Sequence, residues 1–451
     1  MPSSIPADGS RAVENEIMQF LAQVPDGATV QFPEDGIYGQ NSTITVADRT
    51  DLDIDGNGST FKKLTPTDPD KLNNANWRIA GGDGVTLRNM IIRGSFQPPP
   101  RGTMGQGFPS DHGVSIWGAL NLEVRNIQAF NIAGDFLACD PDVRFGPNYA
   151  VDPPCRNVLV DNFHGEHAGR HGFTATHADG FTLQNSSALD VQNEGVDLEI
   201  DVDGELLRNI QLLNNQFSDT FGPAIWIPRG SSPNVENITI SGNTVLRAGD
   251  LCWPAIDVGG STRNIFVRDN HLLTKGDGIR LTNVSSGEVS GNRLENVLFG
   301  APCGFSSNHV PIRLVNSSVT ESDNASTGFC PCSFFGQSAS PSQADLGGPG
   351  EVGVRFQSDV AGSITGIRFY KPEGASGTHV ANLWGDDGSL LASATFTAEQ
   401  ASGWQRVDFP SAVFVRPSTM YTASYHSASG IVASTPESFA TSGLDVPPLH
   451  A

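Results

Sequence analysis

Several features common in other classes of protein are missing from this 451-residue chain. It has 27 Lys and Arg against 49 Asp and Glu, a formal net charge of −22. Nucleic-acid binding needs a basic surface, so this charge argues against nucleic acid as a partner. No apolar run has the length of a membrane span. The N-terminus, MPSSIPADGSRAV, lacks the basic region and apolar core of a signal peptide. We therefore expect either a processed or trimmed form or a misplaced start.

Charged residues are also scarce, at 17%, whereas the chain contains 50 Gly and 29 Pro. This composition is typical of a turn-rich all-β protein rather than a helical one. The length predicts two or three domains.

Short apolar segments recur through the middle of the chain in two alternating sets, with a repeat of 23 to 37 residues. The first set comprises residues 114–117, 136–138, 173–176, 196–199, 225–227, 256–258, 279–281 and 312–314. Most members of the second set, such as Ile210–Leu212 and Ile238–Ile240, have an Asn before them and another within about three residues after them. This period fits one coil of a parallel β-helix, in which Asn side chains form a ladder at a bend. A short amphipathic helix within residues 1–32 is expected to cap the open end.

The repeat, with the opening ADGS…VPDGATVQFP…DLDIDGNGSTF, resembles the pectin-lyase-like superfamily of right-handed parallel β-helices over roughly residues 7–324. That superfamily contains lyases, hydrolases, epimerases and non-catalytic binding proteins, so the resemblance implies a secreted, polysaccharide-active protein without naming a reaction. The repeat region lacks the Asn-Thr-Asp, Asp-Asp, Gly-His-Gly and Arg-Ile-Lys signatures of polygalacturonases. It also lacks the Asp-Pro-His-Asp of alginate epimerases.

A different pattern follows residue 330, with period-2 strands and tight turns that predict an antiparallel β-sandwich. Its segments FFGQSASP, GVRFQSDVAGSITGIRFYK and GTHVANLWGDDGSLLASATF resemble a bacterial secreted domain of unknown function. We therefore expect a β-helix with its cap over 1–330, a sandwich over 333–432, and a tail or the start of a further segment over 433–451.

The six cysteines are even in number, which favours disulfides in a chain of extracellular type. Fifteen pairings are open, and Cys139 with Cys155, which flank a Pro-rich insertion, is the favoured pair. Cys330 and Cys332 lack the spacing of a zinc motif, and the four His between 164 and 177 lack helical i, i+4 spacing. We predict no metal site and no cofactor, with Ca²⁺ possible if the protein is a lyase.

Strand alternation predicts one row of outward side chains on successive coils: Ser115, Leu137, Thr174, Asp197, Trp226, Asp257, Arg280 and Arg313. Asp197 and Asp257 would be about 9.6 Å apart, and Asp197 and Glu199 about 7 Å apart along one strand. Those separations admit a general acid and base on either side of a glycosidic bond. We predict Asp197 and Asp257 as that pair, with Glu199 in support. The predicted substrate contacts are Arg170, His171, Trp226, Arg280, His112 and Asp135.

The predicted groove lies over residues 112–117, 135–139, 170–176, 194–199, 224–228 and 255–259. The ordinary alternative is that these outward carboxylates are merely solvated. A rival function is a non-catalytic binding or adhesion module that holds a glycan with Trp226 and arginines, and a weaker one is a structural spacer.

Overall fold

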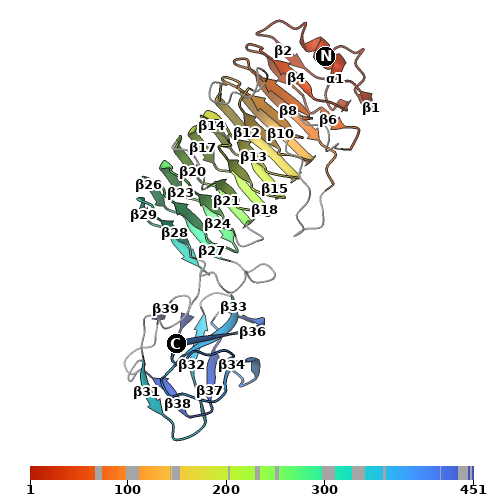
Figure 1. The fold of residues 1–451 in the computed structure, drawn as a ribbon. Helices are drawn as coiled ribbons and strands as arrows, with labels where there is room; N and C mark the ends of the chain where they lie inside the picture. Colours follow the sequence, from red (N-terminus) through yellow and green to blue (C-terminus); the bar gives the residue numbers. More distant parts are fainter. Residues whose placement is uncertain are drawn as a thin grey trace. The chain divides into compact units, whose positions relative to one another are not determined.

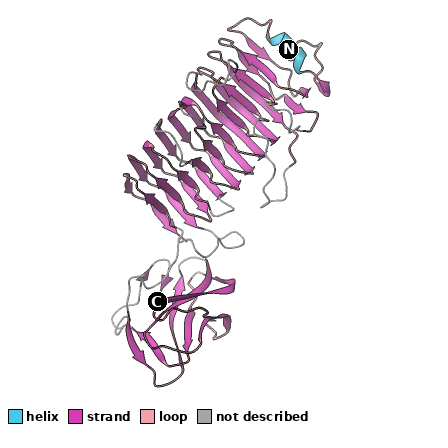
Figure 2. Cartoon of the chain, viewed as in Figure 1, coloured by secondary structure: helices cyan, strands magenta, loops and turns pink. Residues whose placement is uncertain are grey.

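The computed structural model describes residues 1–66, 74–97, 111–142, 144, 153–201, 204–228, 234–248, 253–296, 310–327, 341–358, 362–416, 418–434, 445–446 and 449–451. The chain divides into two compact units, Met1–Ser326 and Thr327–Ala451. Strands dominate both (Figure 2).

The predicted capping helix is present as α1 (Glu14–Leu21), which packs against β3 (Ile37–Gln40) and β4 (Ile44–Ala47). Its apolar side, with Ile17 and Leu21, is buried. The residues that precede it form β1 (Asp8–Ala12), which pairs with β3. The helix therefore lies at the first coil, as expected for a cap on an open solenoid end.

The first set of repeated segments forms a ten-stranded parallel sheet, one strand per coil (Figure 1). This sheet carries the candidate site and is called the site sheet. Its strands in order are β4, β7 (Trp77–Ala80), β9 (Val114–Trp117), β11 (Leu137–Asp140), β13 (Phe173–Ala175), β16 (Val196–Leu198), β19 (Ile225–Ile227), β22 (Ile256–Val258), β25 (Ile279–Thr282) and β28 (Ile312–Val315).

The remaining strands of the first unit form a larger parallel sheet of twenty strands. They are β1, β2 (Thr29–Gln31), β3, β5 (Asp53–Asp55), β6 (Thr60–Lys63), β8 (Thr86–Arg93), β10 (Glu123–Ile132), β12 (Cys155–Ala168), β14 (Ala178–Gln184), β15 (Ser187–Val191), β17 (Leu207–Leu213), β18 (Gln216–Thr220), β20 (Val235–Ser241), β21 (Thr244–Ala248), β23 (Arg263–Arg268), β24 (His271–Thr274), β26 (Gly287–Ser290), β27 (Arg293–Asn296), β29 (Thr320–Ser322) and β30 (Ala325–Thr327). The predicted parallel β-helix is thus confirmed.

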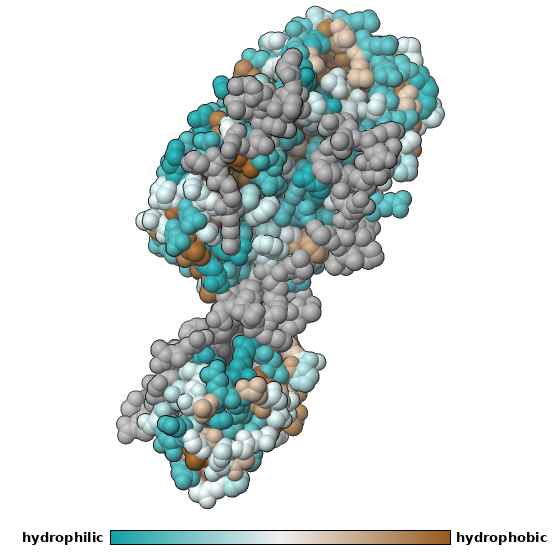
Figure 3. Space-filling view, in the orientation of Figure 1, coloured by the Kyte–Doolittle hydropathy of each residue, from teal (hydrophilic) through white to brown (hydrophobic). Residues whose placement is uncertain are grey.

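The core is a stack of inward apolar side chains from successive coils. Val196, Ile225 and Ile256 occupy equivalent positions on neighbouring strands and are fully buried. Polar residues cover much of the visible face of this unit, where hydrophobic ones form only small patches (Figure 3). Burial at about 25 cal/mol per Å² of apolar surface makes this inner column the main source of stability.

The predicted Asn ladder is also present, and it is buried. The Oδ1 atom of Asn243 accepts the backbone N–H and the side-chain amide of Asn215, at 2.9 and 3.0 Å. Asn243 makes the same two bonds to Asn270 on the next coil, and the series continues through Asn292 to Asn324. Each amide satisfies a buried N–H of the preceding coil, which fixes the coils in register.

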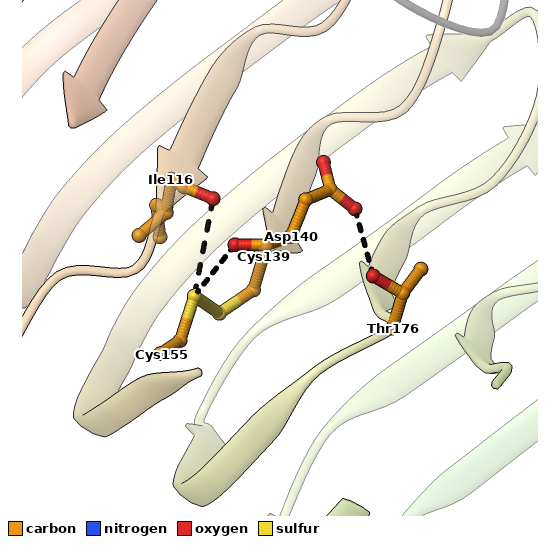
Figure 4. Close-up of a disulfide and its surroundings, with 5 residues drawn as sticks. All are labelled: Ile116, Cys139, Asp140, Cys155 and Thr176. Carbon is orange, nitrogen blue, oxygen red and sulfur yellow. Dashed lines mark hydrogen bonds between the residues drawn. A yellow bond between two sulfur atoms is a disulfide. The ribbon is translucent and has the colours of Figure 1, made fainter. Parts of the chain in front are cut away.

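Cys139 and Cys155 form a disulfide across sixteen residues of sequence, as predicted. Figure 4 shows that the bridge joins β11 of the site sheet to β12 of the larger sheet. The Cys155 sulfur lies 3.5 Å from the carbonyl oxygen of Asp140. Cys252, Cys303, Cys330 and Cys332 lie outside the described residues.

The second unit consists of antiparallel sheets. Six strands form one sheet, in the order β35 (Leu390–Thr395), β34 (His379–Gly385), β37 (Tyr421–Ser427), β32 (Gly350–Ser358), β40 (Leu449–His450) and β39 (Asp445–Val446). Two pairs accompany it: β33 (Gly362–Lys371) with β36 (Gly403–Val415), and β31 (Ser342–Asp345) with β38 (Ile431–Ser434). The segment expected to be a tail thus supplies β39 and β40, and β40 pairs with β32.

Candidate functional site

The second residue of each site-sheet strand points away from the core. Register pairs align Ser115, Ala138, Thr174, Asp197, Trp226, Asp257, Arg280 and Arg313, which we call the central row. The prediction for β11 was wrong by one residue, because Ala138 is in the row and Leu137 faces the core. Phe136 and Leu137 are both apolar, so alternation gave no signal there.

The two acids of this row are not solvated, since Asp197 and Asp257 are each only 1% exposed. Asp257 is fully paired. The Arg280 guanidinium donates to both of its carboxylate oxygens, one bond of 2.8 Å running from Nε to Oδ1. On the next coil Arg313 binds both carboxylate oxygens of Asp277 in the same bidentate way. Bidentate pairs of this kind fix the guanidinium and neutralise the acid.

Asp197 is in a different environment. Among the described residues neither of its carboxylate oxygens has a hydrogen-bond partner, although Oδ2 lies 3.4 Å from Nε2 of His171. Burial, together with the neighbouring charges of Glu199 and Glu194, raises the pKa of Asp197 to about 8, against the opposing effect of His171. Asp197 therefore keeps its proton at neutral pH. A buried carboxyl group without compensating bonds is costly, which is why such groups mark functional sites.

A second line of side chains runs beside the central row, two residues before strands β9, β11, β13 and β16. We call it the leading row, and it alternates His112, Asp135, His171 and Glu194 on successive coils. His112 accepts the backbone N–H of Asp135 at Nδ1, at 3.1 Å, and burial lowers its pKa to about 4. His112 is therefore neutral, with its proton on Nε2.

His171 is the histidine of the leading row whose pKa is raised. Its Nδ1 lies 2.7 Å from Oε2 of Glu194. The two groups form an ion pair, but their angle does not meet hydrogen-bond geometry. Burial lowers the pKa of His171, but Asp135, Glu194 and Asp197 outweigh burial, so the pKa lies above its ordinary value. His171 thus contacts both buried acids, with its backbone N–H bound to Asp135 and its Nε2 lying 3.4 Å from Asp197.

Asp135 is the anchor of this cluster. It accepts the His171 backbone N–H at 3.1 Å and the Thr174 hydroxyl at 2.9 Å, and Arg170 Nε lies 3.7 Å away. Burial opposes ionisation, yet Arg170, together with His171 and its backbone N–H, holds the pKa of Asp135 below its usual range. Asp135 is therefore ionised and fixes the position of Arg170 and His171.

Two more acids lie along the ends of the same strands. Burial raises the pKa of Glu199, on β16's C-terminal side, and the charge of Asp201 adds to this. Asp140 accepts the Thr176 hydroxyl at 3.2 Å (Figure 4), and burial with the charge of Asp135 raises its pKa to about 7. Sequence reasoning missed Asp140 and Glu194. Glu194 stands two residues before its strand, as Asp135 does, and that spacing was the available signal.

Aromatic side chains lie along the same face. Trp226 is half-buried between Asp197 and Asp257 in the central row. Trp253 is 41% exposed, with the Arg280 guanidinium carbon 5.9 Å from its ring centroid. Trp117 lies three coils before Asp197, and Arg78 of the preceding coil stacks over its ring at 3.9 Å. Flat aromatic surfaces beside carboxyl groups suit a sugar ring.

The structure brings together Asp135, Arg170, His171, Asp197 and Glu199, while His112 adjoins Asp135 and Asp257 binds Arg280. Within the described residues, no group of three or more His, Cys, Asp or Glu side chains is arranged to hold a metal ion. Nor does any helix in this part of the chain have the length and apolar character of a membrane span.

Comparison with protein families agrees with this architecture. Residues 154–331 match the model described as a right handed beta helix region. The first unit therefore has the right-handed β-helix fold. Residues 337–451 match the domain of unknown function DUF4082, so this chain is a β-helix with a C-terminal DUF4082 domain. None of the proteins with curated functions matches the sequence.

Among solved structures, an endo-xylogalacturonan hydrolase from Aspergillus tubingensis is similar at 15% identity and a TM-score of 0.51. The match covers 71% of this chain and 91% of that one. A surface adhesin of Streptococcus pneumoniae, PfbA, matches at 15% identity and a TM-score of 0.44, covering 71% and 89%. The A-module of mannuronan C-5 epimerase AlgE6 from Azotobacter vinelandii matches at 14% identity and a TM-score of 0.44, covering 71% and 97%. At these identities the likeness concerns the fold.

Proposed function

We propose that this protein hydrolyses a glycosidic bond of a polysaccharide on the outer face of strands β13 to β22, with Asp197 as the general acid. The observation that carries the proposal is the state of Asp197: a buried carboxyl group that is protonated at neutral pH and has no hydrogen-bond partner among the described residues. A general acid must hold a proton at working pH and release it to the leaving oxygen, and this environment meets that need.

Glu199 is the best placed general base. It lies two residues after Asp197, just beyond the C-terminal end of β16, about 7 Å from Asp197 at the backbone, which leaves room for a water molecule between substrate and carboxylate. Asp257 was the predicted partner, but both of its oxygens are bound by Arg280. We therefore assign Asp257 the role of positioning Arg280, and Trp226 and Arg170 the role of substrate contacts.

In the proposed reaction, Asp197 donates its proton to the glycosidic oxygen as the bond to the anomeric carbon breaks. Glu199 takes a proton from the water that attacks the same carbon from the opposite face, so the anomeric configuration inverts. Elimination would need a base for the sugar ring proton. The pKa of His171 lies above its ordinary value, and Arg280 and Arg313 are bound to Asp257 and Asp277, so none of the three is well suited to act as that base, which favours hydrolysis.

The proposal also includes where the protein meets its polysaccharide substrate. A disulfide between Cys139 and Cys155 is typical of proteins that work outside the cytoplasm. We therefore propose an extracellular protein that meets its substrate there.

The test is incubation with plant, algal and bacterial polysaccharides, with and without Ca²⁺, following both reducing ends and the absorbance of unsaturated uronates. We expect reducing ends without the absorbance. On the substrate so found, Asp197→Asn and Glu199→Gln should each lower kcat by about 10²–10⁴-fold. Glu236→Gln on the larger sheet, whose carboxylate binds Arg263, is the matched control and should stay active. Full activity of Asp197→Asn would remove the assignment.

A second candidate function is non-catalytic glycan binding, and the exposed Trp253 beside Arg280 is the observation that favours it. In that case no product forms with any polysaccharide. The protein would then be retained by one glycan in affinity electrophoresis, and Trp253→Ala rather than Asp197→Asn would release it.

A further inference from the structure

The second unit has a hollow of about 620 Å³ on the solvent side of its six-stranded sheet, with walls from β32, β34 and β37. This volume lies in the range of small-molecule binding sites, roughly 300–1,000 Å³. All of its lining residues belong to the described part of the chain.

The hollow exists because small residues meet where three strands pair. Gly353 on β32 is aligned with Ser424 on β37, and Ser424 with Asn382 on β34. A Cβ atom at Gly353 would lie 2.5 Å from the carbonyl oxygen of Ala423, so no larger residue fits without displacing the backbone. Because Gly353 has no side chain, the sheet surface at this point is not filled, and longer side chains on either side enclose the hollow.

One wall is an indole ring held in a fixed orientation. Trp384 donates from Nε1 to the Ser424 hydroxyl at 2.8 Å, and that hydroxyl donates to Oε1 of Glu351. Asn382 donates its amide to the same Glu351 oxygen at 2.9 Å. Such a connected network sets the ring and the polar groups before any ligand arrives, which lowers the entropy cost of binding.

The charges around the hollow are mainly acidic. Burial works against ionisation of Glu351, but the bonds from Ser424 and Asn382 outweigh burial and hold its pKa below the ordinary value. At the rim, Arg355 donates to Asp386 at 3.0 Å, so its charge is already compensated. The hollow thus offers two carboxylates against one paired arginine, which disfavours an anionic ligand.

We propose that this hollow is a binding site for a neutral oligosaccharide, with a sugar ring stacked on Trp384 and its hydroxyls bound by Glu351, Asn382 and Asp386. A flat aromatic face next to fixed acceptors and an amide matches the apolar C–H face and equatorial hydroxyls of a pyranose. The inference goes beyond the proposed hydrolysis and does not rest on it, since no residue of the site sheet takes part.

The experiment is isothermal titration of the full chain with four- to six-unit cello-, xylo-, manno-, malto-, laminari- and chito-oligosaccharides, and with an oligogalacturonate as the anionic comparison. We expect one neutral series to bind and the oligogalacturonate not to bind at this site. Trp384→Ala should weaken that binding by roughly tenfold or more, because the stacking surface is lost. Glu351→Gln, which keeps the shape and removes the charge, should weaken it by a smaller factor.

The matched control is Trp404→Ala, since Trp404 is a half-buried tryptophan on β36 that packs against Tyr370, away from the hollow. It should bind as the unsubstituted chain does, and near-UV circular dichroism checks that both variants fold. If no neutral oligosaccharide binds at millimolar concentration, or if Trp384→Ala binds as well as Trp404→Ala, the proposal is overturned. Loss of hydrolysis in Asp197→Asn with binding intact would separate this site from the β-helix site.

Discussion

Replacing Asp197 by Asn should stabilise the protein in alkaline solution while it destroys the proposed activity. In the folded protein the pKa of Asp197 is raised from 3.8 to about 8. The folded state therefore holds this proton more tightly than the unfolded chain does. The resulting stability is fully present below the unfolded pKa and is lost as the pH rises to the folded pKa. The Asn side chain of the variant does not titrate, so the variant loses no stability of this kind as the pH rises.

The magnitude follows from that interval. Between pH 5 and the folded pKa of about 8, each pH unit is worth about 1.4 kcal/mol. The stability of Asp197→Asn relative to the unsubstituted chain should thus grow by up to about 4 kcal/mol from pH 5 to pH 9. This figure is a ceiling, because water entry and side-chain relaxation around an ionised Asp197 reduce the penalty.

The assay is differential scanning calorimetry at pH 5, 7 and 9. The transition of the first unit is identified by its larger enthalpy, since unfolding enthalpy scales with length. Asp257→Asn is the control from the same row. It removes the partner of Arg280 and should destabilise by about 2 kcal/mol, with no gain at high pH. A relative stability of Asp197→Asn that stays constant from pH 5 to pH 9 would refute the buried, protonated acid.

Two further predictions concern the solenoid. Asn243→Ala should lower the free energy of unfolding by about 2–4 kcal/mol in urea titrations, because it removes the acceptor of the buried Asn215 N–H and its own side-chain bond to Asn270. Asn237 is exposed, and its side chain bonds only to those of Asn209 and Asn264 among the described residues. Asn237→Gly, which keeps the left-handed backbone at this position, should therefore cost much less, and equal losses would contradict the argument. The double variant Cys139→Ala/Cys155→Ala should lose about 3 kcal/mol of unfolding free energy, as expected for a sixteen-residue closed loop. Addition of dithiothreitol should lower the melting temperature of the unsubstituted chain to that of the double variant. If the reductant lowers the melting temperature of the double variant by an equal amount, this disulfide is not the cause.

Alternation and repeat spacing were enough to predict the β-helix, its cap, the favoured disulfide and most of the central row. These features depend on backbone periodicity, which can be read directly from the spacing of apolar residues in the sequence. The prediction of the central row failed at Leu137, where four consecutive nonpolar residues, FLAC, hide the alternation. There the pairing of β11 with its neighbours, and not the pattern, decides which side chain faces the core.

Which side chains bind one another within the site could not be predicted from the sequence. Asp197 and Asp257 occupy equivalent positions in their repeats, yet one is bound by Arg280 and the other is not bound by any described donor. That difference depends on the residue one coil further on and on the rotamers that reach it. The same holds for Glu194, which contacts His171 from a turn where alternation makes no prediction.

The one-strand-per-coil arrangement of the site sheet also determines how such a protein can be altered. Inserting or deleting one residue inside a strand exchanges its inner and outer faces, so it disrupts the core. Adding or removing a whole coil leaves every face intact and only changes which side chain stands next to Asp197 in the central row. Recombination by complete coils therefore offers a way to move Trp226, or the Asp257–Arg280 pair, one step of about 4.8 Å along the groove without rebuilding the fold.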